Sequence, residues 1–400
     1  MTLTTLTTTR SSSSNLMTRR IISLDANASV PPVHGARAAL LAALDVCDGV
    51  NPSSPHILGR RARRLLDEAR DATAAMLGAS PKDVFFTSGA TEGNRFAVDL
   101  LVEAARHANR PWRVVTTTLE HPSLYKPLRR AAERGLLELA VLPIVDGAVV
   151  VAADAIADLL QGADAVVVTA AHNETGLIID TDALARAIDV YAPGAVFAVD
   201  AAQYLGRRGA PTARADIVVA SAHKLGGIAG AGALTLRGRA RSLALPWVAG
   251  GQEQGVRPGT EATPAIAAMA AAANVIDDTR TAHRALAPLR DLLERAVVDA
   301  GAIALVAAHD RLENTSAFLV PGSDPEALRM TLDQAGVAVG FGAACSALAP
   351  EASPSLMALG LSAHDTRRVV RVSLSPQTSS DDIDEAIVRI VTVIDALKAP

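Results

Sequence analysis

The segments VFAVDAAQ (196–203) and IVVASAHK (217–224) decide the fold of this chain. Each begins with a short apolar run and ends in polar residues: Asp200 and Gln203 follow the first run, and Lys224 follows the second. A short apolar run with polar or turn residues at its ends is typical of a buried strand in a parallel sheet. Lys224 lies 24 positions after Asp200, which is enough for one crossover and one further strand. We therefore expect both residues at the carboxyl ends of neighbouring strands.

The same alternation continues on both sides of these segments, from residue 60 to residue 240. Further apolar runs predict strands at 84–87, 113–117, 137–142, 165–169 and 231–236. Helical patterns separate many of them, at 60–76, 90–107, 123–135, 152–161 and 181–192. Strands that alternate with helices form βαβ units, so we predict an α/β fold with a mainly parallel sheet flanked by helices.

The C-terminal part of the chain has a different pattern. Long helical patterns near 285–300 and 381–397 enclose shorter strands, such as 316–320 and 369–374. This order of elements predicts a smaller α+β domain. We interpret the Ala-rich helical pattern at 261–276 as a helix that links the two domains.

We divide the chain into three parts on this basis. Residues 1–20 are rich in Ser and Thr and lack acidic residues, which predicts a disordered N-terminal extension; a transit-like segment, or a true start at Met17, is the alternative. Residues 21–275 are predicted to form the large domain and residues 276–400 the small C-terminal domain. We expect residues 21–35 to pack with the small domain.

Composition and charge argue against several classes of protein. Apolar residues make up 50% of the chain and charged residues 20%, which supports a sizeable core and argues against a disordered protein. The net charge of −4 provides no electrostatic attraction to nucleic acid or to an anionic membrane. The longest stretch without a charged residue, Gln334–Pro350, is shorter than the ~20 residues of a membrane span. Two cysteines, Cys47 and Cys345, cannot form a disulfide framework, so we expect a reducing, cytoplasmic location.

Lysine is scarce in this chain, and Lys224 is one of only four lysines among 38 basic residues. Arg does not deprotonate in proteins and cannot act as an amine nucleophile, so a Lys in an Arg-rich chain is a candidate for that role. Ligands of parallel α/β sheets bind beyond the carboxyl ends of the strands, where Asp200 and Lys224 are expected. A carboxylate that faces a pyridinium nitrogen and a lysine that forms a Schiff base are the groups that pyridoxal 5'-phosphate (PLP) requires.

The segment Ser88–Glu92 is a candidate phosphate site. It follows the predicted strand at 84–87, and Ala90 and Thr91 open the next helix, whose free N–H groups and dipole attract an anion. An ordinary capped helix start explains the same residues equally well. The joint occurrence with the carboxylate and the lysine favours the phosphate site.

Two candidate residues lie towards the C-terminus. Cys345 lies in GFGAACSA (340–347), whose small residues have little bulk to bury a thiol, although burial is the more common fate of a free cysteine. Cys47 ends a helix-like stretch at 38–46, and we interpret it as structural. Arg371 lies in an alternating strand and can offer two parallel hydrogen bonds to a carboxylate; a salt bridge on the strand surface is the alternative.

Ten short motifs occur in order along residues 22–395. They are LDANASVP (24–31), NPSSPHILG (51–59), TSGATE (87–92), EHPSLY (120–125), HNETG (172–176), VDAAQYLG (199–206), SAHK (221–224), GGQEQGVRPGT (250–260), GAACSA (342–347) and RVSL (371–374). Taken together, they resemble the cysteine desulfurases, PLP enzymes of fold type I in the class V aminotransferase group.

The resemblance implies a role for each matching residue. Lys224 holds PLP covalently, Asp200 pairs with its ring nitrogen, and His121 stacks on the ring and moves protons. Arg371 holds the carboxylate of the substrate. The remaining cofactor contacts, with Asn173 also on the substrate side, are implied for Ala90, Thr91, Asn173, Gln203, Ser221, His223 and, from a second subunit, Thr260.

The implied activity is that of a PLP-dependent L-cysteine desulfurase, which converts L-cysteine to L-alanine. Cys345 attacks the substrate sulfur as a thiolate, and the persulfide passes to a sulfur-acceptor protein that the sequence does not identify. Gly360 lies 15 positions after Cys345, a spacing that resembles the long-loop class. The family implies a homodimer, and we predict no metal site, no direct contact with nucleic acid and no membrane association.

Several other functions are open at this point. A selenocysteine lyase, a cysteine C–S lyase and an aminotransferase share the PLP fold, but a plain aminotransferase needs no loop thiol. A hydrolase built on Cys345 leaves Lys224 and Asp200 unexplained, and a catalytically silent scaffold leaves all of these groups unexplained. The sequence departs from the family pattern at Arg95, where Asn is usual, and at Phe341, where small polar residues are usual.

Overall fold

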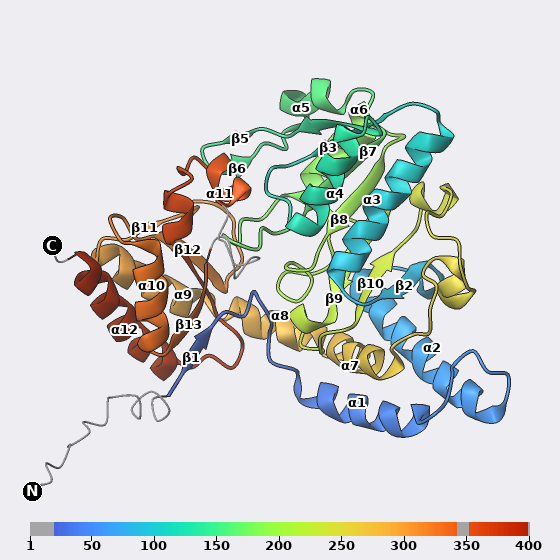
Figure 1. Cartoon of the computed structure of the whole chain (residues 1–400), viewed down its shortest axis with the longest axis horizontal. Helices are drawn as coiled ribbons and strands as arrows, with labels where there is room; N and C mark the ends of the chain where they lie inside the picture. Colours follow the sequence, from blue (N-terminus) through green and yellow to red (C-terminus); the bar gives the residue numbers. More distant parts are fainter. Residues whose placement is uncertain (1–19, 342–351, 399–400) are drawn as a thin grey trace, which may run out of the picture.

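Two main sheets organise the protein (Figure 1). The computed structural model describes residues 20–341 and 352–398, and Cys345 lies outside the described residues. Within those ranges, no helix combines the length and the apolar character that a membrane span requires.

The larger sheet has seven strands in the order β2-β10-β9-β8-β7-β3-β4. Their bounds are β2 (Val84–Thr87), β3 (Trp112–Thr116), β4 (Leu137–Val141), β7 (Ala165–Thr169), β8 (Val196–Asp200), β9 (Ile217–Ser221) and β10 (Gly232–Thr235). All neighbouring pairs from β9 to β4 are parallel, whereas β10 is antiparallel to both β9 and β2. The predicted α/β fold with a mainly parallel sheet is therefore confirmed.

Alternate residues of the large sheet face two separate apolar layers. In β7, Val166 and Val168 pack on one face, and Ala165 and Val167 pack on the other. The first face is covered by α2 (Ile57–Leu77), α5 (Ala153–Leu160), α6 (Thr181–Tyr191) and α7 (Thr263–Asn274), and the second by α3 (Ala90–His107) and α4 (Pro122–Glu133). Because both faces are covered, the central strands β7, β8 and β9 are apolar up to their last residue instead of alternating with polar residues.

The smaller sheet has five strands in the order β1-β13-β14-β12-β11. Their bounds are β1 (Ile22–Leu24), β11 (Ile303–Ala304), β12 (Thr315–Leu319), β13 (Val337–Phe341) and β14 (Val369–Ser373). The helices α9 (Ala287–Asp299), α10 (Pro325–Gln334) and α12 (Ser380–Lys398) share one apolar core with this sheet. Strand β1 pairs in parallel with β13, so the first described residues belong to the same sheet as the C-terminal strands (Figure 1).

The region that connects the two sheets differs from the prediction. One helix was expected at 261–276, but α7 ends at Asn274 and α8 (Ile276–Arg284) begins two residues later. Val275 separates them because its backbone (φ −113°, ψ 21°) is not helical. Asp277 and Asp278 then occupy the first turn of α8, where acidic residues stabilise a helix start. The remaining elements are α1 (His34–Cys47), the hairpin β5 (Ile144–Val145) and β6 (Ala148–Val149), and α11 (Pro354–Ala358).

The carboxyl ends of the central strands meet at one edge of the large sheet. Strand β8 ends at Asp200 and β9 ends at Ser221, and these strands are parallel neighbours. Lys224 closes the short 3-10 turn that directly follows β9. The fold thus brings Asp200 and Lys224 to the same edge, as the sequence pattern predicts.

Candidate active site

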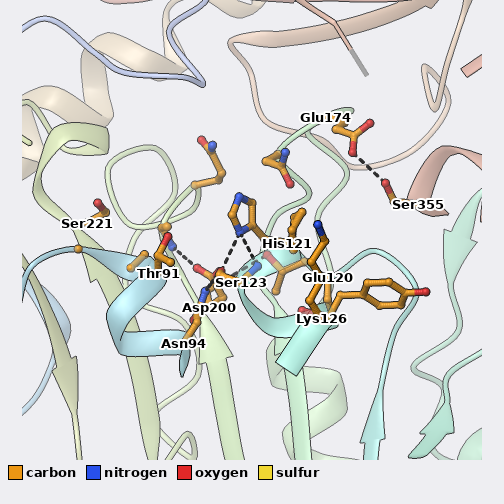
Figure 2. A pocket seen from close by; sticks show the side chains of 18 of the residues that line it. Thr91, Asn94, Glu120, His121, Ser123, Lys126, Glu174, Asp200, Ser221 and Ser355 are labelled. Atoms are coloured by element: carbon orange, nitrogen blue, oxygen red, sulfur yellow. Dashed lines mark hydrogen bonds between the residues drawn. The ribbon is translucent and has the colours of Figure 1, made fainter. Parts of the chain in front are cut away.

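A cavity of about 1000 Å³ lies at this edge of the sheet. Figure 2 shows its walls, with Thr91 and Ser221 on one side and Glu174 and Ser355 on the other. The two main sheets share the lining, because Phe341 and Arg371 belong to strands of the small sheet. Of the site residues predicted from the sequence, ten line this cavity: Ala90, Thr91, His121, Asn173, Asp200, Gln203, Ser221, His223, Lys224 and Arg371.

The first turn of α3 forms one end of the cavity. Gly89 precedes this helix with φ +154°, a conformation that residues with a side chain rarely adopt, and Ala90 and Thr91 begin the helix. Gly232 on β10 lies against it so closely that an added Cβ would be 2.6 Å from the Cα of Gly89. The backbone N–H groups of a first helical turn bind anions, and the adjacent glycines leave space for one.

The carboxylate of Asp200 is held in a fixed orientation at the end of β8. The side-chain amide of Asn94 donates a hydrogen bond to it at 2.6 Å, and the backbone N–H of Ala202 donates another at 3.0 Å (Figure 2). Arg95, the departure noted in the sequence, instead pairs with Asp99 on the exposed side of α3. Of these two neighbours it is Asn94 that lines the cavity, and it was not predicted as a site residue from the sequence.

Lys224 projects its amine towards the backbone of the segment after β1. Nζ donates hydrogen bonds to the carbonyl oxygen of Asn27 and, at 2.9 Å, to that of Ala28. Burial lowers the pKa of Lys224 to about 8, and the charges of Arg207 and Arg371 act in the same direction. An amine with this pKa is partly uncharged near neutral pH, which an amine nucleophile requires.

His121 lies at the start of α4, at the centre of the cavity (Figure 2). Its Nδ1 accepts a hydrogen bond from the backbone N–H of Ser123 at 3.1 Å and contacts the hydroxyl of Ser123 at 2.7 Å. These contacts fix the ring as the cap of α4. Burial lowers the pKa of His121, so the neutral imidazole is favoured in the absence of ligands.

Gln203 combines a satisfied amide with an unsatisfied oxygen. Its Nε2 donates to the carbonyl oxygen of Asn27 at 2.9 Å, whereas its Oε1 is buried and has no hydrogen-bond partner within the described residues. Because buried polar atoms in proteins are nearly always paired, this oxygen points to a ligand with a donor group.

Arg371 is buried at 6% exposure, so the alternative of a strand-surface arginine is wrong in its placement. The residue does form a salt bridge, with Asp25 after β1, and it donates a 3.1 Å hydrogen bond to the backbone oxygen of Asn173. Its Nε is buried without a partner among the described residues. This arrangement leaves donor capacity for a carboxylate in the cavity.

His223 lies on the cavity wall, and burial lowers its pKa to about 4, so the imidazole is neutral. Thr260 does not line this cavity. It lines a second, separate cavity of about 610 Å³, together with Cys47. Burial raises the pKa of the Cys47 thiol, which makes it a poor nucleophile and agrees with the structural interpretation.

The chain was compared with known proteins. A family model described as aminotransferase class V matches residues 24–386. The chain belongs to the class V aminotransferase family. The predicted family is thereby confirmed.

The proteins that this chain resembles in sequence include cysteine desulfurases. It is 33% identical over 372 residues to an IscS-like cysteine desulfurase of Mycobacterium tuberculosis, which covers 90% of this chain and 93% of the relative. It is 30% identical over 402 residues to a selenocysteine lyase of Bos taurus, with 91% of each chain covered. Among solved structures, a NifS-like protein matches with a TM-score of 0.85 at 24% identity, over 94% of this chain and 100% of the other, which supports the predicted fold.

Two buried carboxyl groups of this family member were not predicted as site residues. Glu120 lines the cavity next to His121, and burial raises its pKa to about 8. Glu174 accepts hydrogen bonds from the hydroxyls of Ser353 and Ser355, each at 3.0 Å, and burial raises its pKa as well (Figure 2). The signal in the sequence is their position: each adjoins a predicted site residue at the end of a buried strand.

The residues of the cavity fit PLP. The first turn of α3 suits a phosphate, Asp200 is aimed at the cavity in a fixed orientation, and the amine of Lys224 is activated. The unpaired oxygen of Gln203 adds an acceptor for a polar substituent. These groups match the demands of a phosphorylated pyridine aldehyde.

Proposed function

We propose that the protein is a PLP-dependent L-cysteine desulfurase that works as a homodimer and passes sulfur to an acceptor protein. The observation that carries the proposal is the shared cavity in which the amine of Lys224 and the oriented carboxylate of Asp200 face the guanidinium of Arg371. Family membership and relatives named cysteine desulfurase support it.

Residues of the chain would hold the cofactor at four points: its covalent attachment, its ring nitrogen, its phosphate and its ring. Lys224 would bind it covalently through Nζ, and Asp200 would pair with the ring nitrogen. The N–H groups of Ala90 and Thr91, with Ser221 and His223, would hold the phosphate, while His121, Asn173 and Gln203 would contact the ring. When bound there, PLP would supply an electron sink for bond cleavage at the substrate.

Binding of the substrate would fall to Arg371. Its guanidinium already contacts Asp25 and the backbone of Asn173, so its position is fixed before the substrate carboxylate arrives. A pre-positioned guanidinium loses little entropy when it forms two parallel hydrogen bonds. Neutral His121 and the amine of Lys224 would accept and return protons at the substrate.

Cys345 would take the sulfur. Its thiolate attacks the sulfur of the bound cysteine, so that an S–S bond forms as the substrate C–S bond breaks. The electron pair of the broken bond remains with the carbon, and protonation there gives the methyl group of L-alanine. The products balance as one alanine and one persulfide, without an external oxidant.

A second subunit completes the site in this proposal. Thr260 lies outside the cavity of its own chain and is proposed to reach the phosphate of the partner subunit. Exposed apolar side chains of α1, Leu41 and Leu44, support an interface near the second cavity, of which Leu44 is part of the lining. The two cysteines and the absence of a disulfide framework support a cytoplasmic location.

The test is to purify the full chain with PLP, add L-cysteine and measure alanine, together with the mass of the peptide that contains Cys345. One alanine and one added sulfur per turnover are expected. Alanine without a persulfide, or pyruvate in place of alanine, would contradict the proposal.

Selenocysteine lyase is the second candidate, because a relative at 30% identity carries that name. The two activities differ in whether they need the thiol of Cys345: a desulfurase needs it to accept sulfur from L-cysteine. Parallel assays with L-cysteine and L-selenocysteine, on the wild type and on Cys345→Ala, distinguish them. A variant that keeps full activity on selenocysteine while the wild type is inactive on cysteine would favour the lyase.

A further inference from the structure

Arg207 is a buried cation without a carboxylate partner. It lies in the turn after β8 with 0% of its surface exposed, the largest fully buried side chain of the described protein. Its hydrogen-bond acceptors among the described residues are all neutral: the backbone oxygen of Gln203 at 2.8 Å, that of Ala26 at 3.4 Å and the side-chain oxygen of Asn27 at 3.2 Å. Its Nε has no hydrogen-bond partner among the described residues.

A buried guanidinium of this kind is costly. Charges inside proteins are normally paired, because transfer of an unpaired ion from water costs several kcal/mol. The neighbouring titratable side chain on α8, His283, provides no negative charge, and its own pKa is lowered to about 4 by burial and by Arg207. Arg207 is therefore a charge for which packing alone provides no reason.

The contacts of Arg207 lead directly to Lys224. Arg207 binds the side chain of Asn27, and the carbonyl oxygen of the same Asn27 accepts hydrogen bonds from Lys224 Nζ and from Gln203 Nε2. Arg207 also binds the backbone of Gln203. One guanidinium thus fixes both residues that surround the amine.

Charge acts in the same direction as these contacts. The groups that face Lys224 are the cations Arg207 and Arg371, the anions Asp25 and Asp200, and the neutral imidazoles of His121 and His223. Asp25 is already paired with Arg371, and Asp200 is bound by Asn94. Arg207 is therefore the one charge in this set of facing groups that has no counter-charge among its hydrogen-bond partners in the described part of the chain.

We propose that Arg207 is a positioning residue for Lys224: through Asn27 it holds the lysine amine in place, and its buried positive charge disfavours protonation of that amine. The meaning for cofactor binding rests on the proposed function, in which Lys224 carries PLP. The effect on the amine itself does not, because it concerns only groups of this chain.

The small number of lysines makes a direct test possible. Reductive ¹³C-methylation of the full chain without added cofactor labels Lys82, Lys126, Lys224 and Lys398, and NMR follows each signal with pH; Lys224→Ala assigns the relevant signal. In the wild type we expect the Lys224 signal to titrate near pH 8.

Three variants separate charge from structure. In Arg207→Met the midpoint of Lys224 should move up from about 8 towards 10.5, whereas Arg207→Lys, which keeps the charge, should remain near the wild-type value. Arg208→Met is the matched control, since the neighbouring Arg208 forms ion pairs with Asp310 and Glu313. Its Lys224 midpoint should be that of the wild type.

The covalent reaction provides a second readout. At pH 7, the Arg207→Met protein should form the borohydride-trapped PLP adduct on Lys224 more slowly than the wild type, and raising the pH should restore the rate. If Arg207→Met does not fold by circular dichroism, Arg207→Gln takes its place with the same expectations. An unchanged Lys224 midpoint in the folded neutral variant would overturn the inference. Absence of desulfurase activity in a wild-type protein whose Lys224 titrates near pH 8 would instead count against the proposed function.

Discussion

The side-chain amide of Asn94 holds the carboxylate of Asp200 with a 2.6 Å hydrogen bond, across 106 positions of sequence. The same amide also donates to the hydroxyl of Ser123 at 2.8 Å, which in turn contacts His121. One asparagine on α3 therefore links the carboxylate at the end of β8 to the imidazole at the start of α4. The orientation of both groups depends on it.

Asp200→Ala should keep bound PLP but lose most of its turnover, because the ring nitrogen loses its charged partner. One buried charge partner is worth about 2–5 kcal/mol, which corresponds to a rate loss of more than tenfold. Asn94→Ala should cause a smaller loss, since it removes only the hydrogen bond that orients the carboxylate. Steady-state alanine formation and the absorbance of the bound cofactor measure both effects. Arg95→Ala, on the exposed side of the same helix, is the control and should retain wild-type turnover.

Lys224→Ala should abolish the covalent cofactor absorbance and turnover. Lys224→Arg should fail as well, because a guanidinium cannot form the linkage at neutral pH. Lys126→Ala is a matched control, since this lysine also lines the cavity but comes from α4. Cysteine turnover that survives in Lys224→Ala would show that another group carries the cofactor.

Cys345→Ala should still bind PLP and L-cysteine but should stop before alanine is released, because no thiol accepts the sulfur. Non-reducing mass spectrometry of the wild type should detect one labile sulfur on the Cys345 peptide. Cys47→Ala should leave that signal intact, since Cys47 ends α1 and lines the separate cavity. Normal sulfide release by Cys345→Ala without added thiol would identify a C–S lyase instead.

Gly232→Ala should disturb the first turn of α3. The added Cβ would lie 2.6 Å from Gly89 and 2.7 Å from the oxygen of Ala220, both backbone atoms. Such overpacking costs about 1–3 kcal/mol, and we expect it to weaken PLP binding in parallel. Urea unfolding and equilibrium dialysis of PLP measure the two effects. Gly194→Ala, where nothing lies within 4 Å, should change stability by no more than about 0.5 kcal/mol.

Glu120→Gln should change the pH dependence of stability. The native pKa of Glu120 is raised to about 8, above its ordinary value of 4.5, so the native state retains a proton that the unfolded state releases. Stability from this group is therefore present below about pH 4.5 and is lost as the pH rises towards 8. Glutamine has no such proton, so the decrease in stability over this range should be smaller in the variant. The free energy of unfolding, measured in urea at pH 5 and at pH 8, tests this, with Glu68→Gln on the exposed face of α2 as the control. The same decrease in the free energy of unfolding between the two pH values in the wild type and both variants would refute the prediction.

Much of the fold was predictable because both faces of the large sheet are covered. The central strands β7, β8 and β9 are consequently apolar up to their last residue and stand out from the helices, and α3 has the predicted bounds of Ala90–His107. The break between α7 and α8 was missed because the Ala-rich sequence before Val275 favours a helix locally.

The site was only partly predictable, for a different reason. Asn94 shares a helix face with the buried Ala97 and Leu101, and this three-to-four residue spacing is visible in the sequence. The partners of Lys224 are not, because Asn27 lies 197 positions away and reaches it through the backbone of an irregular segment. A backbone carbonyl has no side-chain identity, so no motif can signal it.

The pairing of β1 with β13 also bears on the order in which the protein is completed during synthesis. The carbonyl groups that receive the Lys224 amine lie just after β1, and β1 is anchored to a strand that ends at Phe341. During translation, the large sheet leaves the ribosome long before that strand exists. A nascent chain can therefore assemble the central strands before the carbonyl groups that bind the Lys224 amine are in place. Stable binding of the cofactor then has to wait until most of the polypeptide has emerged.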